Sequence, residues 1–174
     1  MSVVPIIETE RLRLRGQNMA DFDPSAAMWA DEGVTRFIGG KPFTREEAWA
    51  RFQRYPGHWA LLGYGFWLIE EKASERFVGE GGFGDFKREL APPFEAPEQG
   101  WALAPWAQGR GYANEAVAAM LAWGEAHFNH RDFVCMIAPE NAASIRVAAK
   151  AGYREYARTS YKGAPTILFR RVPF

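Results

Sequence analysis

Two glycines flank an arginine in residues 108–113, immediately before a run of residues with the periodicity of a helix. Glycine permits the sharp turn and the close backbone approach that a bound ligand requires. The first N–H groups of a helix have no partner within it and carry the positive end of its dipole. Gly109 and Gly111 therefore predict an anion site for a phosphate or pyrophosphate, to which Arg110 would add a guanidinium.

The spacing of this turn differs from two common phosphate-binding motifs. In a P-loop, lysine and then serine or threonine follow the last glycine, whereas Tyr112 and Ala113 follow Gly111 here. A dinucleotide-binding fingerprint has a further glycine three positions after Gly111, where this chain has Asn114. The strand–turn–helix unit over residues 101–128 also lies in the middle of the chain, after three predicted strands. A nucleotide-binding protein is therefore the weaker alternative.

The cysteine and histidine residues form no recognisable catalytic or metal-binding set. Cys135 is the only cysteine, which excludes an intramolecular disulfide and a multi-cysteine zinc site. It lies in an apolar run and is expected to be an inert core thiol. His58, His127 and His130 lack the spacing of zinc ligands. We expect no metal.

Hydrophobic periodicity and punctuating residues predict the elements that position the turn. Helix starts are indicated by the Asp23-Pro24 pair, by a capping box at Thr44 and by a cap at Asn141. The first of these helices is expected to end before Gly33 and the second near Pro56. Strands are expected over residues 11–15, 66–69, 77–79, 101–103, 133–137, 153–157 and 166–170, with a fourth helix over 113–128.

This order of elements predicts a single domain, residues 1–174, of the α/β (α+β) class. The strand–helix–strand unit over residues 101–137 should be parallel and right-handed. The proline-rich stretch over residues 87–97 is interpreted as a loop, because the strand pattern resumes directly after it.

The amino-acid composition limits the kinds of partner that the chain is expected to bind. The chain has 174 residues, of which 48% are hydrophobic and 24% charged, as in ordinary globular proteins. Its 21 basic and 21 acidic residues cancel, which argues against a non-specific nucleic-acid binder or a polybasic membrane binder. No apolar run approaches a membrane span, and residues 1–10 lack the pattern of a secretory signal. We expect a cytoplasmic protein with no nucleic-acid or membrane partner.

Three segments carry a family resemblance. Residues 108–113, Gln-Gly-Arg-Gly-Tyr-Ala, resemble the Gln/Arg-x-x-Gly-x-Gly/Ala loop of the GNAT superfamily of N-acetyltransferases. The longer stretch over residues 98–116 resembles the ribosomal-protein N-terminal acetyltransferase branch (RimJ/RimL-like). Residues 8–15 resemble that branch's first strand, and residues 141–153 resemble its Asn-x-x-Ser…Lys-x-Gly-Phe/Tyr segment. The resemblance covers nearly the whole chain in the right order.

The resemblance implies a GNAT fold that binds acetyl-CoA as cosubstrate. Its mixed, mostly antiparallel sheet would have about seven strands, splayed in a V between strands four and five, and about four flanking helices. The pyrophosphate would lie on the N–H groups of residues 108–113, and the pantetheine arm along strand four. The implied cofactor-binding residues are Trp101, Ala102, Leu103, Gln108, Gly109, Arg110, Gly111, Tyr112, Ala113, Asn141 and Lys150.

Within this family frame, several residues have both a chemical and a structural interpretation. The N–H of Leu103 would polarise the thioester carbonyl. Asn141 is either a contact to the pantetheine arm or a plain helix cap. Arg146 and Lys150 would meet the 3′-phosphate or the adenine end of the coenzyme, unless they only form a solvated helix face.

The resemblance also implies the catalytic residues. Glu98, at the start of strand four, is the predicted general base that takes a proton from the amine, and Glu80 is the alternative base. Ser144 is the predicted acid for the leaving thiolate, unless its hydroxyl serves only the first turn of its helix. Many superfamily members use a tyrosine as the acid seven positions after the asparagine, where this chain has Ala148.

The predicted function is N-acetyl transfer from acetyl-CoA to a primary amine by direct attack in a ternary complex. The acceptor would be a protein N-terminus or a small-molecule amine, and the near-zero net charge does not favour a polycation. The alternative is a non-catalytic acyl-CoA-binding module of the same fold. An exposed final strand would allow a homodimer.

Overall fold

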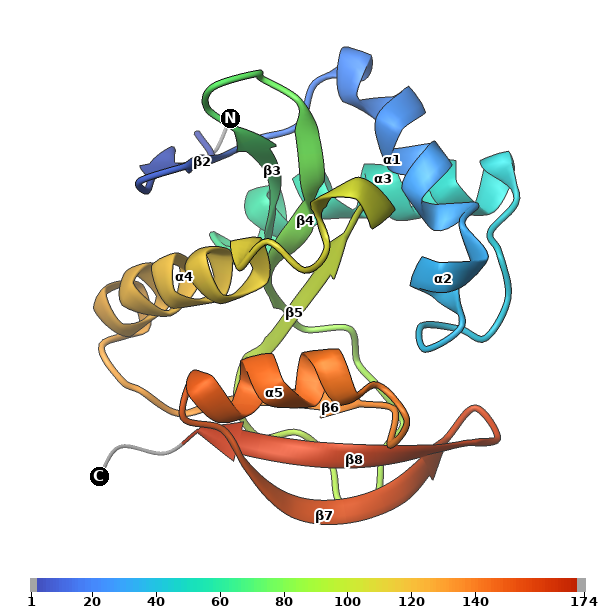
Figure 1. The fold of residues 1–174 in the computed structure, drawn as a ribbon. Helices are drawn as coiled ribbons and strands as arrows, with labels where there is room; N and C mark the ends of the chain where they lie inside the picture. The colour runs from blue at the N-terminus through green and yellow to red at the C-terminus, as the bar shows by residue number, and fades with distance from the viewer. Residues whose placement is uncertain (1–2, 172–174) are drawn as a thin grey trace.

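The computed structural model describes residues 3–171 and contains one sheet of eight strands (Figure 1). The strand order is β1-β2-β3-β4-β5-β6-β8-β7, and every neighbouring pair is antiparallel except β5 and β6. The prediction of a mixed, mostly antiparallel sheet is confirmed; the strand beyond the expected seven is the two-residue β1, too short to show a periodicity. The strands are β1 (Ile7–Glu8), β2 (Leu12–Arg15), β3 (Phe66–Glu71), β4 (Phe77–Gly84), β5 (Glu98–Leu103), β6 (Phe133–Ile137), β7 (Arg154–Tyr161) and β8 (Ala164–Arg171).

Helices cover both faces of the sheet. In Figure 1, α4 and α5 lie on the near face, whereas α3 lies behind the sheet and α1 and α2 lie beside it. The helices are α1 (Phe22–Trp29), α2 (Glu32–Thr35), α3 (Arg45–Leu62), α4 (Tyr112–Phe128) and α5 (Ala142–Lys150), and two 3₁₀ turns cover Met19–Asp21 and Pro105–Ala107. The helix beyond the expected four is the single turn α2.

The first predicted helix is confirmed, with its start shifted by two residues. Asp23 was expected as the cap and Pro24 as the first helical residue, whereas α1 begins at Phe22; it ends at Trp29, before Gly33 as expected. Gly33 then lies inside α2, which is capped by the side chain of Asp31. The difference at the start arises because a preceding 3₁₀ turn, with its own capping box at Asn18, leads directly into α1.

The predicted capping box at Thr44 is confirmed, but the predicted end of that helix is wrong. Thr44 accepts from the N–H of Glu47, whose carboxylate accepts from the N–H of Thr44. The helix α3 runs through Pro56 and ends at Leu62, followed by Gly63 in the left-handed region (φ 74°). Side chains on both sides of Pro56 are buried, so tertiary packing outweighs the backbone hydrogen bond that proline removes.

The sheet splits between β5 and β6. These parallel strands are joined at a single pair, Glu98 with Val134, whereas β5 pairs with β4 along its whole length. Beyond Glu98, the edge of β5 is therefore open toward α5. This is the predicted V-shaped splay, and it leaves main-chain groups of β5 free to face a cleft.

Two apolar clusters hold the helices on the two faces of the sheet. One cluster joins α4 to the sheet through residues such as Phe83, Met120 and Phe133. The other joins α1 and α3 through Trp29 and Phe52. Because side chains alternate along a strand, β5 contributes Leu103 to the first cluster and Ala102 to the second. The helices α4 and α5 on one face and the helices α1 and α3 on the other therefore pack against opposite sides of β5.

The predicted inert thiol of Cys135 lies in the core. The residue is 2% exposed, and burial raises the pKa of its thiol well above the usual range. Among the described residues, no helix has both the length and the apolar content of a membrane span.

Candidate active site

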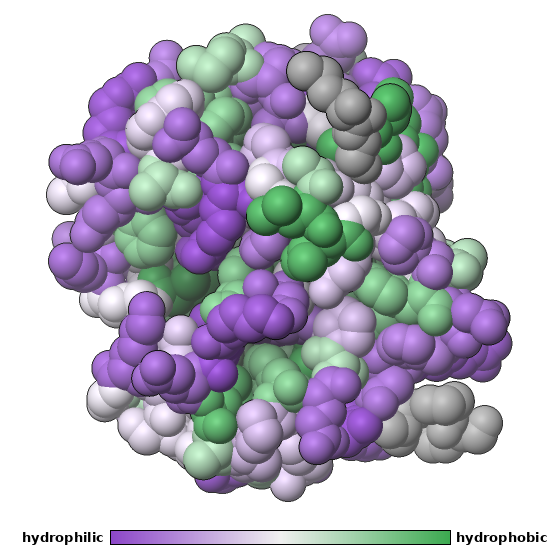
Figure 2. Space-filling view, turned by 180° about the vertical axis from the view of Figure 1, so that it is seen from behind, coloured by the Kyte–Doolittle hydropathy of each residue, from purple (hydrophilic) through white to green (hydrophobic). Residues whose placement is uncertain are grey.

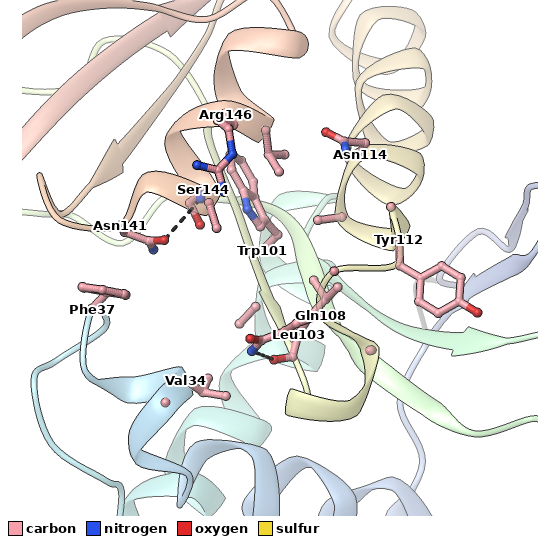
Figure 3. Close-up of a pocket in the computed structure, with 18 of the residues that line it drawn as sticks. Val34, Phe37, Trp101, Leu103, Gln108, Tyr112, Asn114, Asn141, Ser144 and Arg146 are labelled. Atoms are coloured by element: carbon pink, nitrogen blue, oxygen red, sulfur yellow. Dashed lines mark hydrogen bonds between the residues drawn. The ribbon is translucent and has the colours of Figure 1, made fainter.

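A cleft opens where β5 and β6 diverge, between α2, the start of α4 and the first turns of α5 (Figure 3). Apart from Arg110, every predicted coenzyme-binding residue lines this cleft, and so does Ser144. Sequence reasoning had not placed Val34, Phe37 and Ile38 in the cleft. These three come from α2 and the residues after it, where no sequence motif marks them.

The glycine turn has the geometry of an anion site. Gly109 and Gly111 have φ angles of 73° and 79°, which side-chain-bearing residues rarely adopt. A Cβ built on Gly109 meets nothing within 4 Å. Between residues 3 and 171, no protein acceptor is found for the N–H groups of residues 109–114, whereas the N–H of Gln108 donates to Pro105 O at 3.3 Å. The free amides thus begin at Gly109, one residue later than expected.

A second layer holds the turn from outside. The Arg11 guanidinium donates to Arg110 O at 2.9 Å and to Glu115 Oε2 at 2.7 Å. Glu115 Oε1 accepts from the Thr9 hydroxyl at 2.6 Å and from the N–H of Arg11 at 2.8 Å. Burial raises the pKa of Glu115, but these hydrogen bonds outweigh it and leave the pKa lowered. Sequence reasoning had assigned Arg11 only to a strand, because nothing local relates it to a residue about one hundred positions later.

Two side chains of the turn point away from the cleft. Arg110 Nε donates to Trp106 O at 2.9 Å, so its guanidinium is directed back toward the Pro105–Ala107 turn. The Tyr112 ring points outward in Figure 3, and its hydroxyl donates to Glu71. The guanidinium predicted at the phosphate is therefore not placed there; the main chain at these positions forms the turn.

The open edge of β5 presents main-chain groups to the cleft. Ala104 N–H donates to Val78 O at 2.8 Å, so this pair is a bonded one. Bonded pairs alternate along antiparallel strands, which directs the main-chain groups of Leu103 and Trp101 away from β4. Consistently, Gln108 Nε2 donates to Leu103 O at 3.1 Å from the cleft side. This orientation fits the predicted role of the Leu103 N–H.

The helix α5 closes the other side of the cleft. Asn141 Oδ1 accepts from the N–H of Ser144 at 3.2 Å, which confirms the predicted cap. None of the lining residues is acidic, whereas Arg146 and Lys150 are basic. Asn114 Oδ1 is buried without a hydrogen-bond partner among residues 3–171. A cleft with free amides, basic side chains and an unpartnered amide oxygen fits a long, anionic, polar ligand such as a coenzyme A thioester.

The predicted bases lie on the opposite face of β5. Glu98 is 6% exposed, and its Oε2 accepts from Arg88 Nε at 2.6 Å. Burial raises the pKa of Glu98 above the usual carboxyl range, although Arg88 opposes the shift. Oε1 has no hydrogen-bond donor among the described residues. Glu80 is also buried, but it accepts from the Ser25 hydroxyl and from Trp29 Nε1, the latter at 3.0 Å, so both its oxygens are occupied.

This opposite face is itself hollowed. Seen from behind, a recess lies between the part of the molecule that carries α1–α3 and the part that carries β7 and β8 (Figure 2). Apolar atoms lie within the recess and hydrophilic side chains gather at its rim. Glu98 and Arg88 also line a second pocket, under the loop over residues 84–98. Glu98 and Ser144 are therefore separated by β5, one on each face.

A splayed α/β sheet with unpartnered main-chain amides at the splay is suited to a ligand that carries a pyrophosphate, such as a coenzyme. The family model for the acetyltransferase (GNAT) domain matches residues 11–154, and the chain belongs to this family. Its members use acetyl-CoA, so the family indicates acetyl transfer as the activity.

Comparison with individual proteins agrees with this family. An uncharacterized protein of Bacillus subtilis (strain 168), YkkB, is 33% identical across 95% of both chains. The solved structure of a Bordetella pertussis protein assigned to the GNAT-family acetyltransferases is 34% identical, with a TM-score of 0.84, over 97% of this chain and 99% of that chain. RimL, a ribosomal L7/L12 alpha-N-protein acetyltransferase, shares the fold at 18% identity and a TM-score of 0.78, over 97% of this chain and 98% of that chain.

Proposed function

We propose that the protein moves the acetyl group of acetyl-CoA to a primary amine by direct attack in a ternary complex. One observation carries the proposal: the unpartnered N–H groups of residues 109–114, held by two left-handed glycines, face a cleft without acidic side chains. A pyrophosphate on these amides would direct the thioester along the open edge of β5. The acceptor is a small-molecule amine or a protein N-terminus, the acceptor that the name of RimL gives for that protein.

The proposed base and the proposed acid act from opposite faces of β5. The amine nitrogen attacks the thioester carbonyl carbon, the C–S bond breaks, and coenzyme A leaves as a thiolate. Glu98 would take the proton that the amine loses, directly or through a water, from the α3 face. Ser144, on the α5 face, would donate a proton to the thiolate and regain one from solvent. Opposite faces suit an acceptor and a leaving group that must approach and depart separately.

The Leu103 N–H would stabilise the charge that develops on the carbonyl oxygen. The alternation of bonds along β5 directs it toward the cleft. A single main-chain or side-chain donor of this kind is worth about 3 kcal/mol of transition-state stabilisation in other enzymes. The residues that set the acceptor amine against this carbonyl are those around Glu98.

A thiol-release assay tests the proposal. We expect free coenzyme A to appear from acetyl-CoA only when a primary amine is added, with a broad amine panel as acceptors. In Gly111→Val, whose backbone angle a branched residue cannot adopt without strain, calorimetry should show loss of coenzyme binding. The control is Gly57→Ala in α3, where a built Cβ meets nothing within 4 Å.

The alternative function gives a different result in the same experiment. A non-catalytic acyl-CoA-binding module would bind acetyl-CoA through the same turn and release no thiol with any amine. If calorimetry shows tight binding of acetyl-CoA and no amine of the panel is acetylated, the protein is a non-catalytic binding module and not an enzyme. Absence of binding to the intact turn would overturn both.

A further inference from the structure

The charges of three arginines act on Glu98 on the face of β5 opposite the coenzyme cleft; Arg88 contacts it directly, and Arg54 stacks on the same Phe86 ring as Arg88. Arg51 and Arg54 belong to α3, and Arg88 belongs to the loop before β5. All three lower the pKa of Glu98 by their charge, against the larger effect of burial. The single negative charge of the proposed base can balance only one of these three positive charges.

The arginines are positioned by aromatic rings. The guanidinium carbons of Arg54 and Arg88 each lie 4.8 Å from the centroid of the Phe86 ring. Arg51 lies 3.9 Å from the Trp29 ring, and its Nε donates to the Tyr55 hydroxyl at 2.8 Å. Stacking of this kind fixes the direction of a guanidinium while leaving its N–H groups available.

Only one of the three arginines forms an ion pair among the described residues. Arg88 forms an ion pair with Glu98 and also donates to the Tyr161 hydroxyl at 3.2 Å. Among residues 3–171, neither Arg51 nor Arg54 has a carboxylate within ion-pair distance. Glu80 accepts from Ser25 and Trp29 instead. His58 cannot supply a negative charge, because an imidazole is neutral or positive. Its pKa is lowered, chiefly by burial and also by the charge of Arg54.

The uncompensated charge constrains what can approach Glu98. An ammonium without a negative group would be repelled by Arg51 and Arg54, and a polyamine more strongly still. A carboxylate close to the amino group would offset this repulsion, and guanidinium groups bind carboxylates with good geometry. The same field would favour loss of the ammonium proton, which attack on the thioester requires.

We propose that the acceptor carries a carboxylate close to its amino group, and that Arg54, assisted by Arg51, binds this carboxylate while Glu98 faces the amine. The inference rests on the proposed function and specifies its substrate class. Arg54 is on this view a specificity-determining residue, because it contacts a part of the acceptor that does not react.

Matched acceptors test the inference. Amino acids are compared with their carboxamides, and Xaa-Asp dipeptide amides with Xaa-Asn dipeptide amides, in the thiol-release assay. We expect the carboxylate member of at least one series to have the higher kcat/KM by about tenfold or more, the factor for one charge-assisted hydrogen bond. The amine of an amino-acid amide is less basic, so intrinsic reactivity favours the opposite result. Which series shows the preference tells whether an α-carboxylate or a neighbouring acidic side chain is bound.

Variants separate recognition from catalysis. Arg54→Met should bring the ratio of kcat/KM values for the two members of the preferred pair close to one, without raising the KM for acetyl-CoA. The ratio cancels any effect of Arg54 on the basicity of Glu98, since both acceptors use the same base. The control Arg154→Met replaces an exposed arginine on β7 and should leave the ratio intact.

The two proposals fail in different ways. Equal use of acids and amides, or a preference for amides or polyamines, overturns the carboxylate inference and leaves the acetyltransferase in place. A carboxylate preference that survives in Arg54→Met overturns the assignment to Arg54. If none of the amines in the two series or in the broad panel causes release of thiol from acetyl-CoA, the proposed function and the inference are both overturned.

Discussion

Glu98 combines burial, which raises its pKa, with an ion pair to Arg88, which lowers it. A carboxyl with a raised pKa keeps its proton to higher pH, and only the ionised form accepts a proton from the amine. We therefore predict that kcat/KM rises with pH through a pKa above the usual carboxyl range. Glu98→Gln should remove this limb and lower kcat/KM by about 10²–10⁴-fold.

Two further variants check the origin of that limb. Arg88→Met removes the nearest positive charge and should move the limb to higher pH. Glu80→Gln should retain it, because Ser25 and Trp29 already occupy the Glu80 oxygens. A pH profile that is unchanged in Glu98→Gln but altered in Glu80→Gln would transfer the role of base to Glu80.

Arg11 contacts the glycine turn over residues 108–113 from outside and does not line the cleft. It fixes Arg110 O on the outside of the turn, which keeps the amides of the turn directed inward. We predict that Arg11→Gln raises the KM for acetyl-CoA about tenfold, from the loss of charge-assisted hydrogen bonds, with a small change in kcat. Steady-state kinetics with both substrates varied measures this.

The matched control for Arg11 lies two residues further along the chain, in β2. Arg13 pairs with Glu8 and Glu70 and not with the turn, so Arg13→Gln should leave the KM for acetyl-CoA near its original value. An equal rise of the KM for acetyl-CoA in both variants would show that Arg11 acts only through general stability, and a rise in the KM for the amine alone would contradict its role at the turn.

At the scale of elements, the sequence predicted those features that depend on interactions between residues close together in the chain. The caps at Thr44 and Asn141 and the glycine turn involve residues within a few positions of one another. The passage of α3 through Pro56 was not predictable, because it depends on burial against distant strands. The ion pair between Arg88 and Glu98, and the Arg11 contacts to the turn, depend on which loops meet in space.

The close packing of α4 on the sheet depends on the absence of a side chain at Gly124. A Cβ there would lie 2.7 Å from Phe83 Cζ and 3.2 Å from Phe133 Cζ, and both rings are fully buried. Alanine would gain about 1 kcal/mol of helix propensity, but displacing two core rings costs about 1–3 kcal/mol. We predict that Gly124→Ala lowers the free energy of unfolding by about 1 kcal/mol, measured by urea denaturation.

A glycine in α3 provides the opposite expectation. Gly57 has nothing within 4 Å of a built Cβ, so Gly57→Ala should raise the free energy of unfolding by about 0.5–1 kcal/mol. If Gly124→Ala were equally stabilising, the rings of Phe83 and Phe133 would have room to move, and the packing of α4 would be looser than the structure shows.

At the scale of the whole molecule, the sheet is joined across its middle by little backbone pairing. One parallel pair links β5 to β6, while β6, β8 and β7 pair along most of their length. The cleft residues come from both sides of this junction: the turn before α4 on one side, and α5 on the other. A ligand that spans the cleft therefore connects two parts that the backbone connects weakly.

This arrangement predicts strong stabilisation by the coenzyme. A ligand that binds only the folded state at 100 times its Kd adds about 2.7 kcal/mol to the free energy of unfolding. We expect coenzyme A to raise the Tm accordingly, and ATP or NAD at the same concentration to leave it nearly unchanged. Equal shifts with ATP would favour a nucleotide-binding protein. The Gly111→Val variant should lose the shift with coenzyme A.

The contribution of α5 can be measured in the same way. Arg146 and Lys150 line the cleft one helical turn apart, and no acidic lining residue competes for them. If they hold the 3′-phosphate, the double variant Arg146→Gln, Lys150→Gln should lose this contribution. Coenzyme A should then raise its Tm only as much as 3′-dephospho-coenzyme A does. The original protein should distinguish the two ligands, since charge-assisted contacts add about 1.5–3 kcal/mol. Identical shifts for both ligands in the original protein would assign the two side chains to a solvated helix face.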